Sequence, residues 1–150
     1  MQKLKLPYGS LVLVADGKKA LFLFNKGDEK FLNLVTARVF NDDNPSTHEQ
    51  GTDRPGRVHS SDHSGRRSSV ELTDWHMLQE QHFAKEIAIS LEKYVRSNNI
   101  KKIVVVAPAR ALGDLRSAIH ADVKKHIVAE IDKDLTKHPV GEIEKHLLNA

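Results

Sequence analysis

The sequence contains no cysteine, which excludes disulfide bonds and thiol chemistry and fits a reducing compartment. It also has no apolar run that approaches about 18 residues, so no segment is expected to span a membrane. The N-terminal apolar run is short and leads directly into Asp16-Gly17, without the small-residue cleavage site of a secretory signal peptide. These absences favour a cytoplasmic protein.

Motifs of common catalytic and cofactor sites are missing as well. There is no Gly-rich phosphate loop, no GxGxxG sequence and no Ser/His nucleophile motif. His59 and His63 have the spacing of a metal-ligand pair, but neither a cysteine nor a second pair accompanies them. We therefore predict no cofactor and no metal site, and the sequence favours a binding protein over an enzyme.

The composition is that of an ordinary globular domain. Of the 150 residues, 39% are hydrophobic and 29% are charged, and 23 Lys and Arg against 20 Asp and Glu give a net charge of +3. This length predicts one domain over residues 1–150. The mild positive charge permits an anionic partner without requiring one.

Hydrophobic periodicity divides most of the chain into strands and helices. Strands are expected at residues 10–15, 20–24, 31–40, 103–107 and 127–131. Helices are expected at residues 74–97 with Thr73 as the N-cap, from Pro108 through Val123, and after Pro139. The uninterrupted run IVVVA at 103–107 is typical of a central strand covered on both faces.

The order of these elements is βββ–loop–αβαβα. It predicts an α/β fold of three layers, in which helices cover the faces of a five-stranded mixed sheet. The first, fourth and fifth strands would be parallel, and the second and third would extend an antiparallel edge. The same order of elements occurs in ribonuclease H-like folds.

Ligands of such sheets bind at the carboxyl ends of the parallel strands. The candidate pocket residues there are Asp16, Lys18, Arg110, Asp132, Lys133, Asp134 and Thr136. Three interpretations stay open: a metal-dependent hydrolase in which the three aspartates hold a divalent ion, a phosphate or carboxylate pocket with Arg110 as a bidentate anchor, and a turn followed by a solvated loop with local ion pairs.

Residues 41–72 form the longest segment without helical or strand periodicity. Only three aliphatic residues occur in it, and four arginines lie between Arg54 and Arg67. A loop of this length within one domain is usually functional or disordered. We expect it to be mobile and to carry an interaction site, because arginines on a mobile backbone are a common way to grip phosphates. A solvated insertion without a partner is the alternative.

Four uncommon motifs occur in one order along the chain. They are EQGTDRPGR at 49–57, TDWH at 73–76, VAPARALGDLR at 106–116 and DKDLTKHP at 132–139. In these motifs, and in the opening LVLVADG, the chain resembles the bacterial host attachment protein family, "protein required for attachment to host cells". That family is related to the middle domain of archaeal and eukaryotic peptide-chain release factors.

The resemblance implies a β-meander, a long loop and a long helix, and a loop that reaches the ribosome. The release-factor loop carries a GGQ tripeptide, whereas this chain has Gln50-Gly51 at the corresponding place. The leading hypothesis is a cytoplasmic, release-factor-like module that binds the ribosome or structured RNA. The contacting residues would be Gln50, Gly51, Arg54, Arg57, Arg66 and Arg67. The alternatives are the hydrolase and an adaptor that acts indirectly in attachment through a protein partner.

Overall fold

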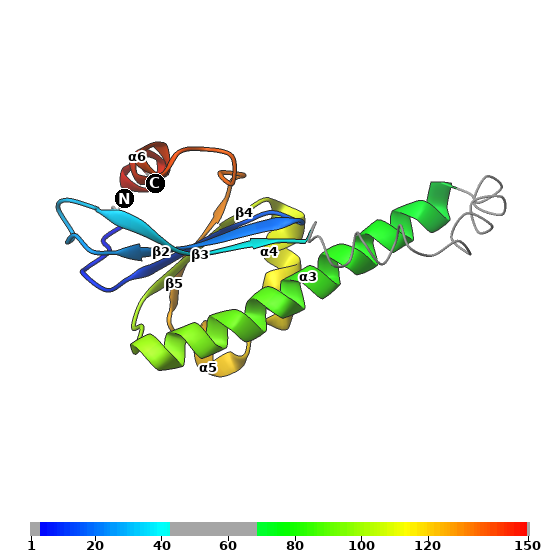
Figure 1. Ribbon diagram of the computed structural model, residues 1–150, viewed down its shortest axis with the longest axis horizontal. Helices are drawn as coiled ribbons and strands as arrows, with labels where there is room; N and C mark the ends of the chain where they lie inside the picture. The colour runs from blue at the N-terminus through cyan, green and yellow to red at the C-terminus, as the bar shows by residue number, and fades with distance from the viewer. Residues whose placement is uncertain (1–3, 43–68, 150) are drawn as a thin grey trace.

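The computed structural model describes residues 4–42 and 69–149. Its elements follow the predicted order (Figure 1). They are β1 (Leu11–Ala15), β2 (Lys19–Asn25), β3 (Leu34–Asn41), α3 (Ser69–Asn98), β4 (Ile103–Ala107), α4 (Ala109–Ala118), α5 (Ala121–Lys124), β5 (Ile127–Asp132) and α6 (Val140–Leu148).

The five strands form one mixed sheet in the order β3-β2-β1-β4-β5. β1 is parallel to β4, and β4 is parallel to β5, whereas β2 is antiparallel to both β1 and β3. The predicted fold class is therefore confirmed. Since β3 runs in the same direction as β1, four of the five strands end on one side, which we call the carboxyl end of the sheet. The opposite side is the amino end.

Helices cover both faces of the sheet and give the three layers (Figure 1). α3 and α4 pack on one face, against side chains such as Leu13 and Phe22, and α6 packs on the other, against Val12 and Val104. β1 and β4 are buried along their whole length, as a central strand with two covered faces requires. Burial also raises the pKa of Tyr94, which packs edge-on against Phe22 on the first face.

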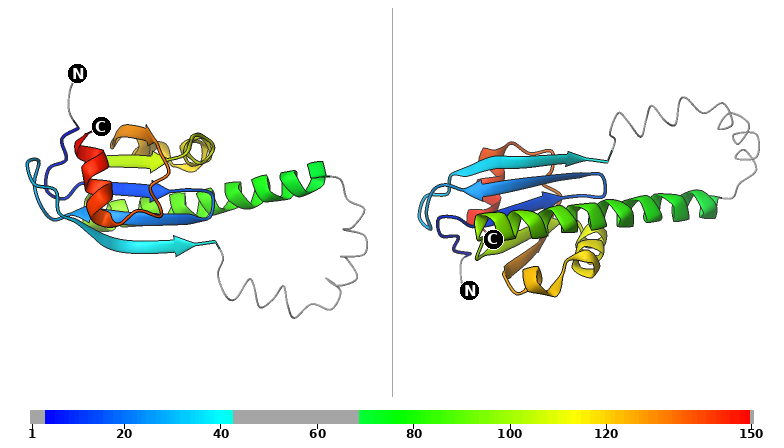
Figure 2. Two further views of the ribbon diagram at one scale, coloured as in Figure 1. Left: turned by 90° about the horizontal axis from the view of Figure 1, so that it is seen from above. Right: turned by 60° about the horizontal axis from the view of Figure 1, so that its bottom comes forward.

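α3 is longer than its contact with the sheet. It begins at Ser69, so the prediction of Thr73 as the N-cap is wrong. No residue from 74 to 82 is buried, and buried positions begin at Phe83 and continue through Ile87 and Leu91. The first turns of α3 therefore project beyond the carboxyl end of the sheet (Figures 1 and 2).

The helix predicted from Pro108 through Val123 is interrupted. α4 ends at Ala118, Ile119 is extended, and α5 starts after His120. The cause is local, because the His120 ring accepts a hydrogen bond from the Asp122 N–H at 3.0 Å and caps a new helix. Ile119 and Val123 are nevertheless both buried, so the apolar stripe continues across the break.

The segment between β3 and α3 is shorter than the loop predicted at 41–72, because β3 includes Asn41 and α3 starts at Ser69. Its predicted mobility concerns residues outside those that the structure describes. Within residues 4–42 and 69–149, no helix has both the length and the apolar character needed to cross a membrane.

Candidate functional site

The turn between β1 and β2 opens the candidate site at the carboxyl end of the sheet. Asp16 Oδ1 accepts hydrogen bonds from the backbone N–H groups of Lys18 and Lys19, both at 2.7 Å. Asp16 Oδ2 accepts a third from the Thr136 hydroxyl at 2.9 Å. One carboxylate thus shapes the tight turn predicted at Asp16-Gly17 and also holds the loop after β5, which lies 120 positions along the chain.

Thr136 lies between two carboxylates. Its hydroxyl is 2.9 Å from Asp16 Oδ2 and 2.8 Å from Asp134 Oδ1, and its side chain is buried. A hydroxyl carries one proton, so it donates to one of these oxygens at a time. The Asp134 oxygen also accepts from the Thr136 N–H at 3.3 Å. These three residues form a closed cluster that ties the β1–β2 turn to the loop between β5 and α6.

Glu80 of α3 also lies at this end of the sheet, beside the β1–β2 turn. Its side chain lies against Gly17, where an added Cβ would stand 2.6 Å from Glu80 Oε2. Arg110 Nη1 is 3.6 Å from Glu80 Oε1, which is longer than a hydrogen bond, and no described residue donates one to that buried oxygen. Arg110 therefore offsets the charge of Glu80 without satisfying its oxygen.

The predicted three-carboxylate metal site is not formed by the described residues. Asp16 and Asp134 meet through Thr136, but no three His, Asp or Glu side chains within residues 4–42 and 74–149 converge closely enough to hold an ion. Asp132 and Lys133 are exposed. The cavity beside Asp16 and Glu80 has a volume of about 10 Å³, which is room for one water molecule.

The predicted anchor Arg110 faces Glu80 and is 62% exposed. Lys18 is exposed and contributes its backbone N–H to the turn. Of the predicted pocket residues, the structure thus brings together Asp16, Thr136 and Asp134, and leaves three cations, Lys18, Arg110 and Lys133, at the surface. Among the described residues, this arrangement places three basic side chains at the surface beside a carboxylate cluster.

The predicted loop contacts lie outside the described residues: Gln50, Gly51, Arg54, Arg57, Arg66 and Arg67. The structure does show where the chain enters and leaves that segment. The Asp42 N–H donates to the Lys18 carbonyl at 2.8 Å, so the loop begins beside the β1–β2 turn. It ends at Ser69, at the projecting end of α3 (Figure 2).

Two features of α3 are not predicted by the sequence patterns described above. Glu80 lies three positions before Phe83 and therefore on the helix face that reaches the core. A carboxylate at such a position is the sequence signal that could have pointed to it. Trp75 and Leu78 are 58% and 59% exposed. They lie on the opposite face of α3, as does the exposed Ile89. The sequence contains the signal for this, because a period of 3.6 residues places these three side chains away from the stripe of Phe83, Ile87 and Leu91.

Comparison with known protein families identifies one to which this chain is similar. A family model described as bacterial archaeo-eukaryotic release factor family 12 matches residues 9–147. The match runs from just before β1 into the last turn of α6, and it confirms the release-factor relation that the motifs predicted. Its description does not mention host attachment, which stays a prediction. No curated protein matches the chain.

Proposed function

Because this chain belongs to bacterial archaeo-eukaryotic release factor family 12, we propose that it is a release-factor-like module that binds the ribosome or another structured RNA. The binding segment is residues 41–72, and the contacts are made chiefly by Arg54 and Arg57, with Gln50 and Gly51 beside them. A partner of this kind places the protein in the cytoplasm.

The observation that carries the proposal is the position of the loop ends. The chain leaves the sheet at Asp42, beside the β1–β2 turn, and returns at the end of α3 that projects past the sheet. Both attachment points are on the same side of the molecule. The segment between these points therefore begins and ends on that side, which suits contact with a large partner there.

The charges at the carboxyl end support the same partner class. Asp16 and Asp134 are already engaged by Thr136 and by backbone N–H groups. Lys18, Lys133 and Arg110 are exposed, against one further exposed carboxylate at Asp132 and the partner of Arg110, Glu80. Exposed cations beside engaged carboxylates favour approach of a phosphate backbone, which supplies much of the affinity in RNA complexes. The exposed Trp75 adds an aromatic surface at the same end, and bases stack on such side chains.

The proposal is limited to binding. The chain has Gln50-Gly51 in place of the GGQ tripeptide of release factors, and the described residues hold no three-carboxylate metal site. Neither peptidyl-tRNA hydrolysis nor the metal-dependent hydrolase has an observation in its favour, so no reaction is assigned.

Co-sedimentation with ribosomes across a salt series tests the proposal. The double variant Arg54→Ala/Arg57→Ala removes two phosphate contacts, so the slope of log K against log salt falls by roughly 1.4 to 1.8. The matched control is Lys124→Ala/Lys125→Ala, which removes the same charge from exposed positions of α5 and its C-cap. Equal slopes for the two double variants, or no ribosome binding by the unmodified chain at low salt, would contradict the proposal.

A further inference from the structure

A rigid turn at the amino end of the sheet presents an exposed aromatic ring. The Ser10 N–H donates to the Pro7 carbonyl at 3.1 Å, and Gly9, at the third position of the turn, has φ of +86°. This is a type II β-turn, which needs a residue that tolerates positive φ at that position. Tyr8 occupies the second position, and its side chain is 68% exposed.

A buried asparagine at the end of β2 holds this turn in place. Asn25 is fully buried, and its Nδ2 donates to the Leu6 carbonyl at 2.9 Å. The backbone of Asn25 makes two further bonds to the turn, from the Gly9 N–H and to the Ser10 carbonyl, both 2.9 Å. Because the backbone beneath Tyr8 is held at several points, the exposed ring has a defined place, resting edge-on against Phe24 with 5.8 Å between centroids.

The opposite rim is the end of α3 and is also rigid. Asn99 has φ of +53°, and the Ile100 N–H donates to the Val95 carbonyl at 3.0 Å, which is the C-terminal closure of a Schellman motif. Asn98 Nδ2 donates to the Tyr94 carbonyl at 3.0 Å. The side-chain oxygen of Asn98 has no donor among the described residues and remains an acceptor at the rim.

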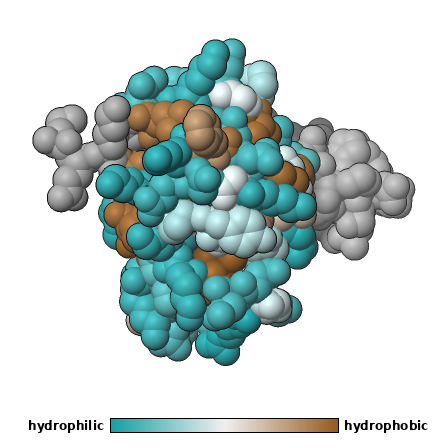
Figure 3. Space-filling view, turned by 90° about the vertical axis from the view of Figure 1, so that its left-hand side faces the viewer, coloured by the Kyte–Doolittle hydropathy of each residue, from teal (hydrophilic) through white to brown (hydrophobic). Residues whose placement is uncertain are grey.

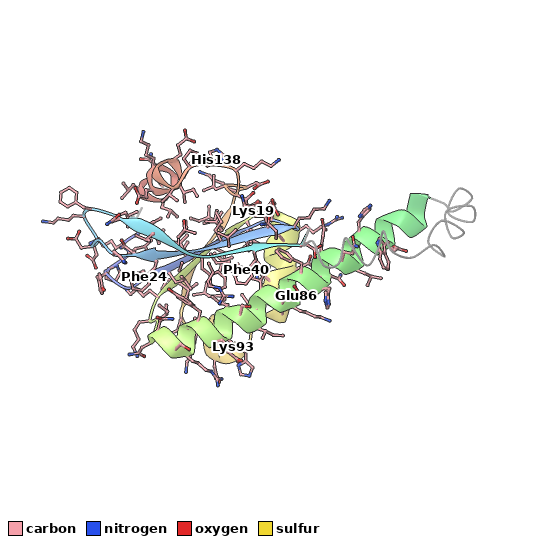
Figure 4. The ribbon with its side chains drawn as sticks, in the orientation of Figure 1. Lys19, Phe24, Phe40, Glu86, Lys93 and His138 are labelled. Atoms are coloured by element: carbon pink, nitrogen blue, oxygen red, sulfur yellow. The ribbon has the colours of Figure 1, made fainter. Side chains whose placement is uncertain are left out.

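Between these rims lies a groove of about 460 Å³, a volume typical of ligand sites. It is lined by Pro7, Tyr8, Gly9, Ser10, Phe24, Asn98, Asn99, Lys101 and Lys102. Two of these described residues are cationic and none is acidic. Phe24 marks this end of the sheet in Figure 4, and Figure 3 shows the same end as a mainly hydrophilic surface with separate apolar patches.

We propose that this groove binds a nucleotide unit, that is, an aromatic base joined to a phosphate. Tyr8 offers the ring on which a base stacks, Lys101 and Lys102 offer the charge that a phosphate requires, and the Asn98 oxygen accepts a hydrogen bond from the edge of the base. The site is at the end of the sheet opposite the loop and does not depend on the loop binding RNA.

The experiment is a titration of the full chain followed by NMR, with adenosine 5′-monophosphate and a single-stranded adenine oligonucleotide as the two probes. The Tyr8 ring and the backbone amides of Lys101 and Lys102 shift with either probe. Response to both assigns the site to free nucleotides and RNA strands alike, and response to the oligonucleotide alone assigns it to strands; both support the proposal. Ribose 5-phosphate, which lacks the base, binds on the order of tenfold more weakly.

Variants separate stacking from charge. Tyr8→Ala and Lys101→Ala/Lys102→Ala each weaken binding on the order of tenfold, whereas Tyr8→Phe, which keeps the ring, binds as the unmodified chain does. The matched controls are Phe31→Ala, which removes an exposed aromatic that does not line the groove, and Lys124→Ala/Lys125→Ala. The proposal is overturned if neither probe shifts Tyr8 at millimolar concentration, or if Tyr8→Ala binds as tightly as Phe31→Ala.

Discussion

The two ends of the sheet use polar side chains in opposite ways. At the carboxyl end, Asp16 and Asp134 share the hydroxyl of Thr136, so the chain's own carboxylates lie where ligands of parallel sheets usually bind. At the amino end, Asn25 satisfies its amide entirely within the backbone and leaves an aromatic ring and two lysines free beside a groove. The difference teaches that a preformed groove can lie at the end of the sheet opposite the one where ligands of this architecture usually bind.

The same contrast separates two modes of recognition. At the carboxyl end, the proposed binding residues belong to the segment between β3 and α3, so the proposed recognition there involves a long stretch of chain. The amino end has its groove already shaped by a type II turn and a helix terminus. A preformed groove loses little conformational entropy on binding, which suits a small ligand, whereas a long segment suits a large partner.

The largest expected effect is at the amino end. Asn25→Ala removes four side-chain hydrogen bonds, to the carbonyls of Leu6 and Pro7 and from the N–H groups of Gly27 and Asn33. We expect a loss of about 3 kcal/mol or more in the free energy of unfolding, measured by urea denaturation. A loss below about 1 kcal/mol would show that the turn is not held by this residue.

A smaller effect is expected at the carboxyl end. Thr136→Val keeps the shape of the side chain but removes the proton donated to Asp16 or Asp134, and we expect a loss of about 1–2 kcal/mol. A double-mutant cycle with Asp16→Asn checks the origin of the loss, because two residues in one hydrogen-bond network are not additive. Additive losses would mean that the contact between the β1–β2 turn and the loop after β5 does not stabilise the fold.

The smallest effect is a dependence on pH beside the amino-end groove. Burial raises the pKa of Tyr94 above 10.0, so in the unfolded chain its phenol ionises at a lower pH than in the folded protein. The stability that this difference contributes is complete below pH 10.0 and is lost as the pH rises through the folded-state pKa. We expect Tyr94→Phe to lose less stability than the unmodified chain over this alkaline range in urea unfolding. Identical losses would contradict the burial of the phenol.

The sequence predicted the parts of this structure that depend on local pattern. The apolar run of β4 and the stripe of Phe83, Ile87 and Leu91 identified a covered sheet and a long helix. The rule for parallel strands correctly brought Asp16 and Thr136 to one end, because strand direction alone determines where strands finish.

Other features depend on contacts between distant segments, and the sequence did not reveal them. Glu80 lies against Gly17, which comes from a turn more than 60 positions earlier, and Arg110 lies beside Glu80 only because α3 and α4 pack together. The exposed ring of Tyr8 was overlooked although Pro7 and Gly9 carry a turn signal, because its importance comes from Asn25 on another strand. The break after Ala118 was missed since histidine is not among the usual capping residues.

The most direct test of the contrast between the two ends is hydrogen–deuterium exchange of the full chain, free and bound to ribosomes, read by mass spectrometry of peptides. The account predicts slower exchange on binding in residues 74–82 of α3 and in the β1–β2 turn, where the loop is attached. Slowing confined to residues 7–10 and 98–102, with residues 74–82 unchanged, would contradict it.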